Sequence, residues 1–162
     1  LEFWYPYYRL KEEGAEVTVI GSGSSEAYKS KHGIEVKQDI SAENANADEF
    51  DAVIIPGGYC PDYLRRYNSV IEFVRRMYEK GKIVAAICHA GWVLASANIV
   101  RGRKLTCFKS IKDDMINAGA IYLDKEVVRD GNLITSRFPG DLPYFCTEIV
   151  KALREQEVQI RS

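Results

Sequence analysis

Two short, uninterrupted apolar runs with a helical pattern between them constrain the fold of this chain more than any other feature. The runs cover 52–55 (Ala-Val-Ile-Ile) and 83–87 (Ile-Val-Ala-Ala-Ile), and neither contains a polar residue. Such runs are typical of parallel strands that are covered on both faces. The pattern over 69–80 is amphipathic and ends at Gly81. The order strand, helix, strand predicts a parallel sheet with helices on both faces.

The remaining patterns fit the same architecture. We expect further helices over 2–13, 90–97, 111–118 and 142–155, and strands over 16–21 and 34–39. Asp130 and Gly131 lie between two apolar segments within 127–135 and predict a small β-hairpin. No pattern is visible over 156–162. The 162 residues are therefore expected to form a single α/β domain, 1–162.

The net charge and the cysteines limit which binding partners and which cellular compartment are expected. The chain has 22 Lys and Arg against 23 Asp and Glu, and this net charge of −1 gives no electrostatic reason to expect a nucleic acid or a membrane as partner. Its four cysteines include no C-x-x-C pair, so we expect free thiols and a reducing, cytoplasmic location. Since there are only two histidines, no metal site is predicted, and no cofactor.

The strongest local signal is the junction between the second apolar run and the helix that follows it. Cys88 stands directly after the run, His89 follows it, and Ala86, Ala90 and Gly91 are small. Small neighbours permit the sharp strand-to-helix turn that lifts a nucleophile clear of the backbone. A helix N-terminus and a neighbouring histidine both favour the thiolate. The pattern predicts a reactive cysteine, although most free cysteines are inert and buried.

A second turn is expected at the same edge of the sheet. Pro56, Gly57 and Gly58 end the first apolar run, and ligands of open parallel sheets bind at the carboxyl ends of the strands. Glycine lets a backbone N–H approach a substrate oxygen closely. The N–H groups of Gly58 and His89 are candidates for an oxyanion hole. The alternative is an ordinary connection between strand and helix.

Several motifs together resemble the PfpI/ThiJ group of intracellular cysteine-protease-like proteins, a branch of the class I glutamine amidotransferase-like superfamily. The resemblance runs from Leu1 to about Leu153 and implies a flavodoxin-like three-layer sandwich with a mostly parallel sheet. The motifs lie at 56–58 (PGG), 86–89 (AICH), 101–104 (RGRK), 111–119 (IKDDMINAG), 130–132 (DGN) and 135–137 (TSR).

The resemblance also implies roles for individual residues. Cys88 would be the nucleophile, His89 its partner, and the amides of Gly58 and His89 the oxyanion donors. An acidic residue after the Pro-Gly-Gly turn would reach the histidine of a neighbouring subunit. Asp62 occupies that position, and its alternative role is that of an N-terminal helix cap.

Other side chains are expected to line the substrate pocket, namely Tyr59 and Trp92 together with the backbone at Gly57. Phe108 joins them at a position where related proteins often have tyrosine, so that a hydroxyl group is lost there.

One part of the family pattern is expected outside this sequence. Related proteins carry a first strand ahead of the opening helix, and a glutamate at its end contacts the cysteine. By alignment on 1–7 that glutamate would lie just before Leu1, and so we expect about a dozen further residues there, forming a central strand and supplying the carboxylate.

Two classes of function fit these residues. The first is a cysteine-dependent enzyme in which the Cys88 thiolate attacks a carbonyl carbon: a peptidase or amidase is the leading interpretation, and a glyoxalase or protein deglycase acting on methylglyoxal-type dicarbonyls is the alternative. The second is a redox-sensing stress-response protein that works through oxidation of Cys88. The expected substrate is accordingly a peptide or a small carbonyl compound.

We predict that the protein self-associates, as a dimer or a ring of dimers. The reasons are the position of Asp62 after the Gly58 turn and an opening helix that carries five aromatic residues within 3–8, more than one helix face can bury. Light scattering at micromolar concentration measures the mass directly. A monomer of the full-length protein would contradict the prediction.

Overall fold

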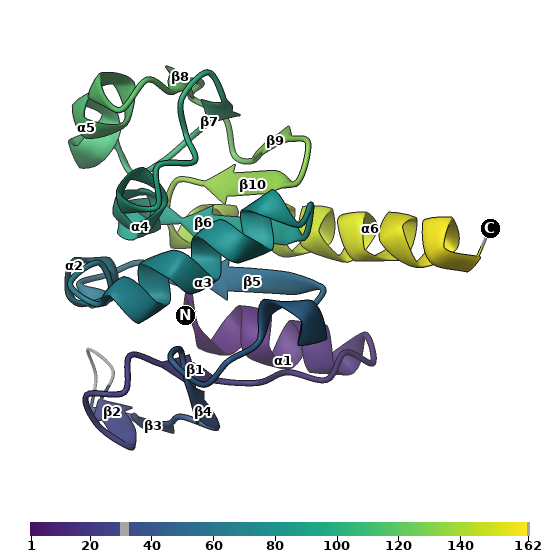
Figure 1. Cartoon of the computed structure of the whole chain (residues 1–162). Helices are drawn as coiled ribbons and strands as arrows, with labels where there is room; N and C mark the ends of the chain where they lie inside the picture. Colours follow the sequence, from purple (N-terminus) through teal and green to yellow (C-terminus); the bar gives the residue numbers. More distant parts are fainter. Residues whose placement is uncertain (30–32, 162) are drawn as a thin grey trace.

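The computed structural model describes residues 1–29 and 33–161 (Figure 1). Helices and short strands alternate along most of the chain, as the sequence predicts. The helices are α1 (Trp4–Glu12), α2 (Cys60–Leu64), α3 (Asn68–Glu79), α4 (Gly91–Ser96), α5 (Lys112–Asn117) and α6 (Leu142–Arg161). The strands are β1 (Ile20–Gly21), β2 (Ala27–Lys29), β3 (Glu35–Lys37), β4 (Ile40–Ser41), β5 (Ala52–Ile55), β6 (Ile83–Ile87), β7 (Lys104–Leu105), β8 (Ile121–Tyr122), β9 (Val128–Asp130) and β10 (Leu133–Ser136).

The central sheet has the order β5-β6-β10-β9. β5 pairs with β6, and β6 with β10, in parallel, whereas β9 pairs with β10 antiparallel. The predicted hairpin around Asp130 is therefore part of the main sheet, because β10 pairs with β6 on its other side. The mostly parallel sheet of the α/β, flavodoxin-like fold is confirmed.

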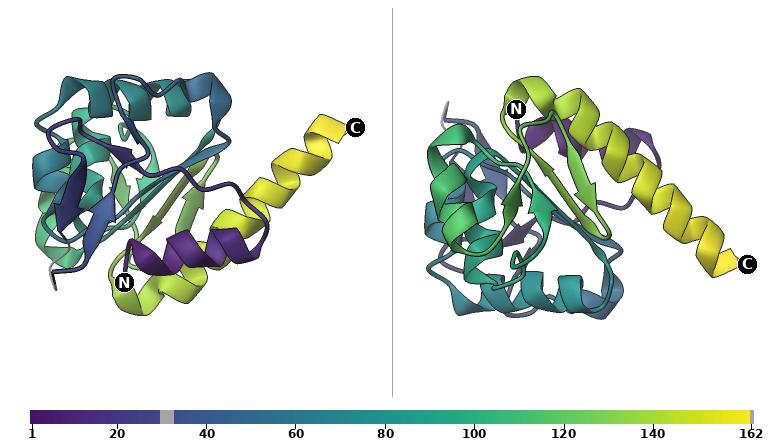
Figure 2. Two further views of the ribbon diagram at one scale, coloured as in Figure 1. Left: turned by 90° about the horizontal axis from the view of Figure 1, so that it is seen from below. Right: turned by 90° about the horizontal axis from the view of Figure 1, so that it is seen from above.

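Helices cover both faces of this sheet, which makes three layers. Figure 2 shows α3 on one side of the strands and α1 and α6 side by side on the other. The strand β6 is buried along its whole length and alternates between the two cores. Val84 and Ala86 pack with α3 and α4, and Ile83, Ala85 and Ile87 pack with α1 and α6. This is why the run has no polar residue on either face.

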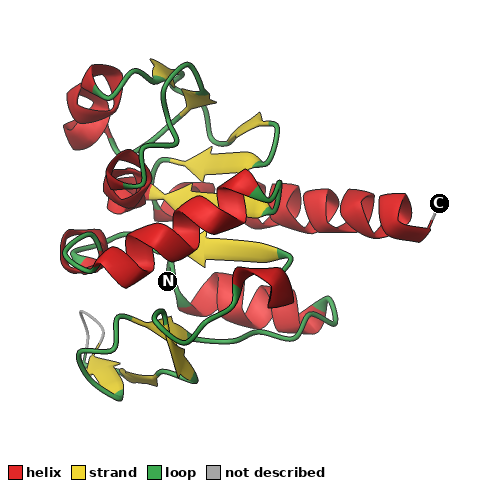
Figure 3. Ribbon diagram, viewed as in Figure 1, coloured by secondary structure: helices red, strands yellow, loops and turns green. Residues whose placement is uncertain are grey.

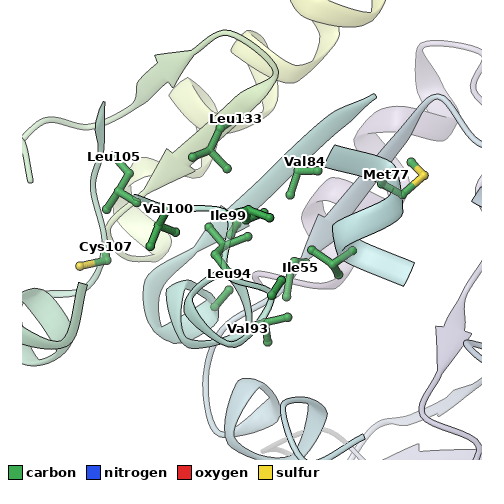
Figure 4. Packing of buried hydrophobic residues seen from close by; sticks show 14 of the residues in the cluster. Ile55, Met77, Val84, Val93, Leu94, Ile99, Val100, Leu105, Cys107 and Leu133 are labelled. Carbon is green, nitrogen blue, oxygen red and sulfur yellow. The ribbon is translucent and has the colours of Figure 1, made fainter. Parts of the chain in front are cut away.

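The core under α3 and α4 is built from branched and flexible apolar side chains (Figure 4). Met77 on α3 and Leu94 on α4 are fully buried there, and they pack with Val84 of the central strand and Leu133 of β10. The short helices α2 and α4 contact each other at the end of the sheet where β6 stops. This packing holds the turns after β5 and β6 next to one another.

The part of the chain before β5 differs from the sequence prediction. The strand expected over 16–21 is reduced to β1, which pairs in parallel with β4, and the strand over 34–39 is β3, which forms a hairpin with β2. Both lie outside the main sheet (Figure 3). β5 is thus the edge of that sheet in the part of the chain described. The expectation of a further strand supplied from before Leu1 stays a prediction.

The closing helix is longer than predicted. It was expected over 142–155, but α6 continues to Arg161 and its last turns extend beyond the body of the domain (Figure 2). Among the helices in the described ranges, none has the length and apolar character needed to cross a membrane.

We predict that Ile149→Ala lowers the free energy of unfolding by about 2–5 kcal/mol, because the side chain is fully buried between α6 and the sheet and its loss leaves a cavity. Ile116→Ala makes the same chemical change on α5, where the side chain is 43% exposed, and should cost less than about 1 kcal/mol. Urea denaturation measures both. Equal losses would mean that the α6 face is not a packed core.

Candidate active site

Cys88 occupies a strained position between β6 and a short 3-10 turn, Cys88–Ala90, that leads into α4. Its φ is +62°, in the left-handed region that side chains other than glycine rarely adopt, and it is 8% exposed. Gly91 lets the neighbouring segment pack closely against the start of α4, because a Cβ there would lie 3.0 Å from Met115 Sδ and 3.2 Å from Ile111 Cδ1. The sharp strand-to-helix turn predicted at Cys88, called the elbow below, is therefore present.

Glu2 approaches the elbow from the segment just before α1. Its Oε2 accepts a hydrogen bond of 2.7 Å from the N–H of Gly57, and its carboxyl group hydrogen-bonds Cys88. Gly57 has no room for a side chain, because a Cβ would lie 2.3 Å from Glu2 Oε2 and 2.7 Å from Cys88 Cβ. The glycine is thus needed for close packing of three chain segments, not for a free backbone approach to substrate.

The sequence prediction for this glutamate was wrong. It placed the carboxylate before Leu1, whereas Glu2 already lies beside Cys88. The reason is local: α1 begins only at Trp4, and the N–H of Tyr5 bonds the carbonyl of Leu1, so the first residues form a turn rather than helix. That turn directs Glu2 to the sheet edge. A glutamate two residues before a helix was the signal available in the sequence.

Burial raises the pKa of both acids in this pair. Burial is the largest effect on Glu2, and the amide of Gly57 only partly offsets it. Burial and the charge of Glu2 raise the pKa of the Cys88 thiol to about 11, against the lowering effect of the amides of His89 and Gly58. Because the two groups are in contact, the carboxyl group and the thiol titrate as a coupled pair. The expectation that the helix N-terminus and His89 favour the thiolate is corrected, since it omitted burial and Glu2.

The amides proposed as oxyanion donors lie at the sulfur. The N–H groups of Gly58 and His89 act on Cys88 as hydrogen-bond donors to its Sγ, which is why they lower its pKa. Gly58 has a φ of +68° and stands free of contacts at its Cβ position. Two N–H groups that stabilise negative charge at Sγ can also stabilise it on an oxygen bonded to the carbon that Sγ attacks.

The His89 ring is held on every side. Its Nδ1 lies 3.1 Å from Cys88 Sγ and its Nε2 lies 3.1 Å from Ser110 Oγ. Phe108 stacks on the ring at 5.0 Å between centroids, and Trp92 meets it edge-on at 5.3 Å. Burial lowers the pKa of His89, so the ring is neutral at neutral pH. Ser110 was not identified from the sequence, because a lone serine in a loop carries no signal.

Asp62 does not join this group of residues. It lies in the first turn of α2 and forms a salt bridge of 2.5 Å with Arg66. The alternative role as a helix cap is wrong, since Tyr59 holds the cap position and no side chain caps that helix. The role of Asp62 toward the histidine of another subunit stays a prediction.

Comparison with known proteins identifies the family of the chain. The sequence profile of the DJ-1/PfpI family matches residues 1–152. The chain belongs to the DJ-1/PfpI family. It is 47% identical over 154 residues to a protein named Deglycase PfpI from Pyrococcus furiosus, covering 95% of this chain and 92% of that one.

Two further family members bear on function and fold. YraA of Bacillus subtilis, whose name assigns it provisionally to the cysteine proteases, is 39% identical over 154 residues, which cover 95% of this chain and 91% of YraA. The crystal structure of Drosophila melanogaster DJ-1beta superposes with a TM-score of 0.87 at 36% identity, covering 94% of this chain and 82% of that one.

In this family member the residues predicted to line a pocket are divided. Phe108 and Trp92 contact the His89 ring, and Trp92 Nε1 donates to Asp114 at 2.9 Å. Tyr59, which follows the Gly58 turn, is 79% exposed. Two aromatic side chains therefore lie against His89. The carboxylate of Glu2 lies instead at the turn that contains Gly57.

We predict that Cys88→Gly is more stable than Cys88→Ala by about 0.5–1 kcal/mol, because glycine adopts a positive φ without the penalty that a Cβ carries. The order should reverse at Cys146 in α6, where glycine in a helix costs about 1 kcal/mol relative to alanine. Urea denaturation of the four variants measures this. A more stable Cys88→Ala would show that the elbow is not strained.

Proposed function

We propose that this protein is a cysteine-dependent glyoxalase or deglycase that acts on methylglyoxal-type dicarbonyls and on their adducts with amines. The observation that carries the proposal is the Glu2 carboxyl group, which the N–H of Gly57 holds beside Cys88 and whose pKa burial raises. A thiol that adds to an aldehyde carbon must deliver its proton to the new hydroxyl group, and later steps must take a proton from carbon. A buried carboxyl group of raised pKa is suited to both transfers.

The first step forms a bond between Cys88 Sγ and the aldehyde carbon, and the thiol proton passes to the carbonyl oxygen. The product is a hemithioacetal. The amides of Gly58 and His89 stabilise the negative charge on that oxygen until the proton arrives. When the aldehyde carbon is already bonded to an amine as a carbinolamine, the same attack releases the free amine, which takes up the proton.

The second half returns the enzyme to its starting state. A base removes the proton from the carbon bonded to sulfur, the hydroxyl proton passes to the neighbouring carbonyl oxygen, and a proton is returned to the neighbouring carbon, so that the hemithioacetal becomes a thioester of a 2-hydroxy acid. Water then cleaves the thioester and restores the thiol. No oxidant or cofactor enters this balance. Glu2 and His89 each contact Cys88 and supply the two bases that these reaction steps require.

Peptide hydrolysis, the leading interpretation from sequence, requires the histidine to act as a general acid. The amine of a peptide bond is a poor leaving group, so the histidine must protonate it as it leaves. A carboxylate normally orients the imidazole and stabilises its protonated form. In the part of the chain described, His89 Nε2 faces the Ser110 hydroxyl, and Asp62 is paired with Arg66. These contacts favour the dicarbonyl reaction. The name of the PfpI relative supports it as well.

The test is a screen of the full-length protein against methylglyoxal, an amine adduct of methylglyoxal, and fluorogenic peptides. We expect turnover of the first two with release of a 2-hydroxy acid. Cys88→Ser should remove activity, and Glu2→Gln should lower kcat/KM by about 100-fold, the usual contribution of a general acid–base group. Gln keeps the shape and can still accept a hydrogen bond from Gly57.

Two results would contradict the proposal. Cleavage of the peptides without dicarbonyl turnover would establish the peptidase interpretation. One equivalent of Cys88 oxidised by peroxide, with no turnover of any substrate, would establish redox sensing. Glu12→Gln is the matched control, since it makes the same change on an exposed glutamate at the end of α1, and it should leave the rate unchanged.

A further inference from the structure

The end of β10 lies beside the end of β6, where Cys88 stands. In the parallel ladder Ser136 is paired with Ile87, the residue before Cys88. Since neighbouring strands run about 4.8 Å apart, the chain that follows Ser136 leaves the sheet next to the elbow. Figure 1 shows β5 and β10 ending at this same edge. The first residues past the ladder, Arg137 and Phe138, are therefore neighbours of the active site, and neither was predicted to line the pocket.

Phe138 keeps a fixed position although its side chain is 40% exposed. Its carbonyl accepts a hydrogen bond of 2.9 Å from the N–H of Asp141, which closes the 3-10 turn Pro139–Asp141. Its ring lies over Gly140, where a Cβ would be only 2.7 Å from Phe138 Cε2. The turn therefore holds the ring at the edge of the sheet, and Gly140 leaves the room that the ring needs.

A buried carboxylate fastens this turn to the strand. Asp141 is 2% exposed, and its side chain accepts three hydrogen bonds from Arg137: from the backbone N–H at 3.1 Å, from Nε at 2.9 Å and from Nη2 at 3.0 Å. The remaining guanidinium nitrogen, Nη1, donates to Asp124 at 3.0 Å. The guanidinium lies 5.0 Å from the centre of the Phe138 ring and supports it.

A second phenyl ring borders the elbow from another segment. The N–H of Phe108 donates to the carbonyl of Cys88 at 3.2 Å, and the ring, stacked on His89, is 36% exposed. Phe108 and Phe138 thus come to the end of β6 from two separate segments. Exposed apolar surface is present on both of them.

The contacts of Phe138 give it the properties of a binding residue. A side chain that is exposed but already fixed loses little conformational entropy when a ligand covers it, and an aromatic ring offers the ligand a large apolar face. Arg137 with its two carboxylate partners carries one more negative charge than positive charges. This excess disfavours an anionic group beside the ring.

We propose that Phe138 is a specificity-determining residue of the dicarbonyl site, and that its ring contacts the substituent on the ketone carbon of the substrate. The preferred substrate class is accordingly a dicarbonyl with an uncharged, apolar substituent, methyl or larger, over glyoxal, which has a hydrogen there. The inference rests on the proposed function for its reaction, but the contact itself can be measured at Cys88 without turnover.

The alternative role of the ring is to cover Gly140 and cap the turn. A cap contributes to the stability of the turn and does not distinguish one substrate from another. The two roles therefore differ in selectivity, which is what the experiments measure.

The first experiment compares glyoxal, methylglyoxal and phenylglyoxal as substrates of the full-length protein, with each substrate as its own reference. Phe138→Ala should lower kcat/KM about tenfold for phenylglyoxal and about twofold to threefold for methylglyoxal, and leave glyoxal nearly unchanged, since the loss follows the apolar surface that meets the ring. Phe138→Leu keeps an apolar side chain and should recover part of the loss. Tyr144→Ala removes another exposed aromatic side chain, in the first turn of α6, and should leave all three rates unaltered.

The second experiment needs no turnover. Iodoacetamide and N-phenyl iodoacetamide form the same kind of thioether with Cys88, with loss of iodide, and differ by one phenyl group. Peptide mass spectrometry separates Cys88 from the exposed Cys60. The rate of the phenyl reagent relative to iodoacetamide should fall about threefold to fivefold in Phe138→Ala and stay unchanged in Tyr144→Ala.

An unchanged ratio of alkylation rates in Phe138→Ala, or an equal loss of kcat/KM for all three dicarbonyls, would overturn the inference and leave the ring as a cap of its turn. Failure of the proposed function would look different. It would appear as absent turnover of every dicarbonyl, while the alkylation ratio still falls in Phe138→Ala and supports the contact.

Discussion

The close approach of three chain segments at Gly57 is the constraint on which the active-site region depends. Its N–H holds Glu2 at 2.7 Å, and the absence of a side chain lets Glu2 and Cys88 share the space beside it. The segments come from the start of the chain, the end of β5 and the end of β6. A parallel sheet brings the ends of β5 and β6 to one edge, and α1, packed under the same sheet, brings the first residues there.

The central third of the fold followed from the sequence because its signals are local. The apolar runs at 52–55 and 83–87 coincide with β5 and β6, and the strand-end cysteine indicated the elbow. The region before β5 could not be predicted in the same way, because its strands are only two or three residues long. The hydrophobic periodicity of such short strands does not show which strands pair with each other. The positions of Glu2 and Ser110 depend on contacts across 55 and 21 residues, respectively, which no local pattern encodes.

The site separates three tasks among groups of different polarity. In the proposed reaction the backbone amides stabilise charge, the carboxyl group of Glu2, whose pKa is raised, stores a proton, and the imidazole of His89, whose pKa is lowered, accepts one. Burial is the largest cause of the pKa shifts of Glu2, Cys88 and His89, so one low-dielectric environment acts on all three groups. The aromatic rings of Phe108 and Trp92 contribute to it by covering His89. The titration of the groups around Cys88 thus depends also on side chains that contact only His89.

The distribution of these groups along the chain has a consequence for the protein while it is being made. Glu2 leaves the ribosome long before Gly57, and its bond to Gly57 spans 55 residues. The turn that carries Ser110 follows, and the sheet is closed only when β10 pairs with the far edge of β6. Until then Cys88 has no base, no proton store and no fixed amides. The arrangement of groups around Cys88 therefore comes into being together with the finished fold.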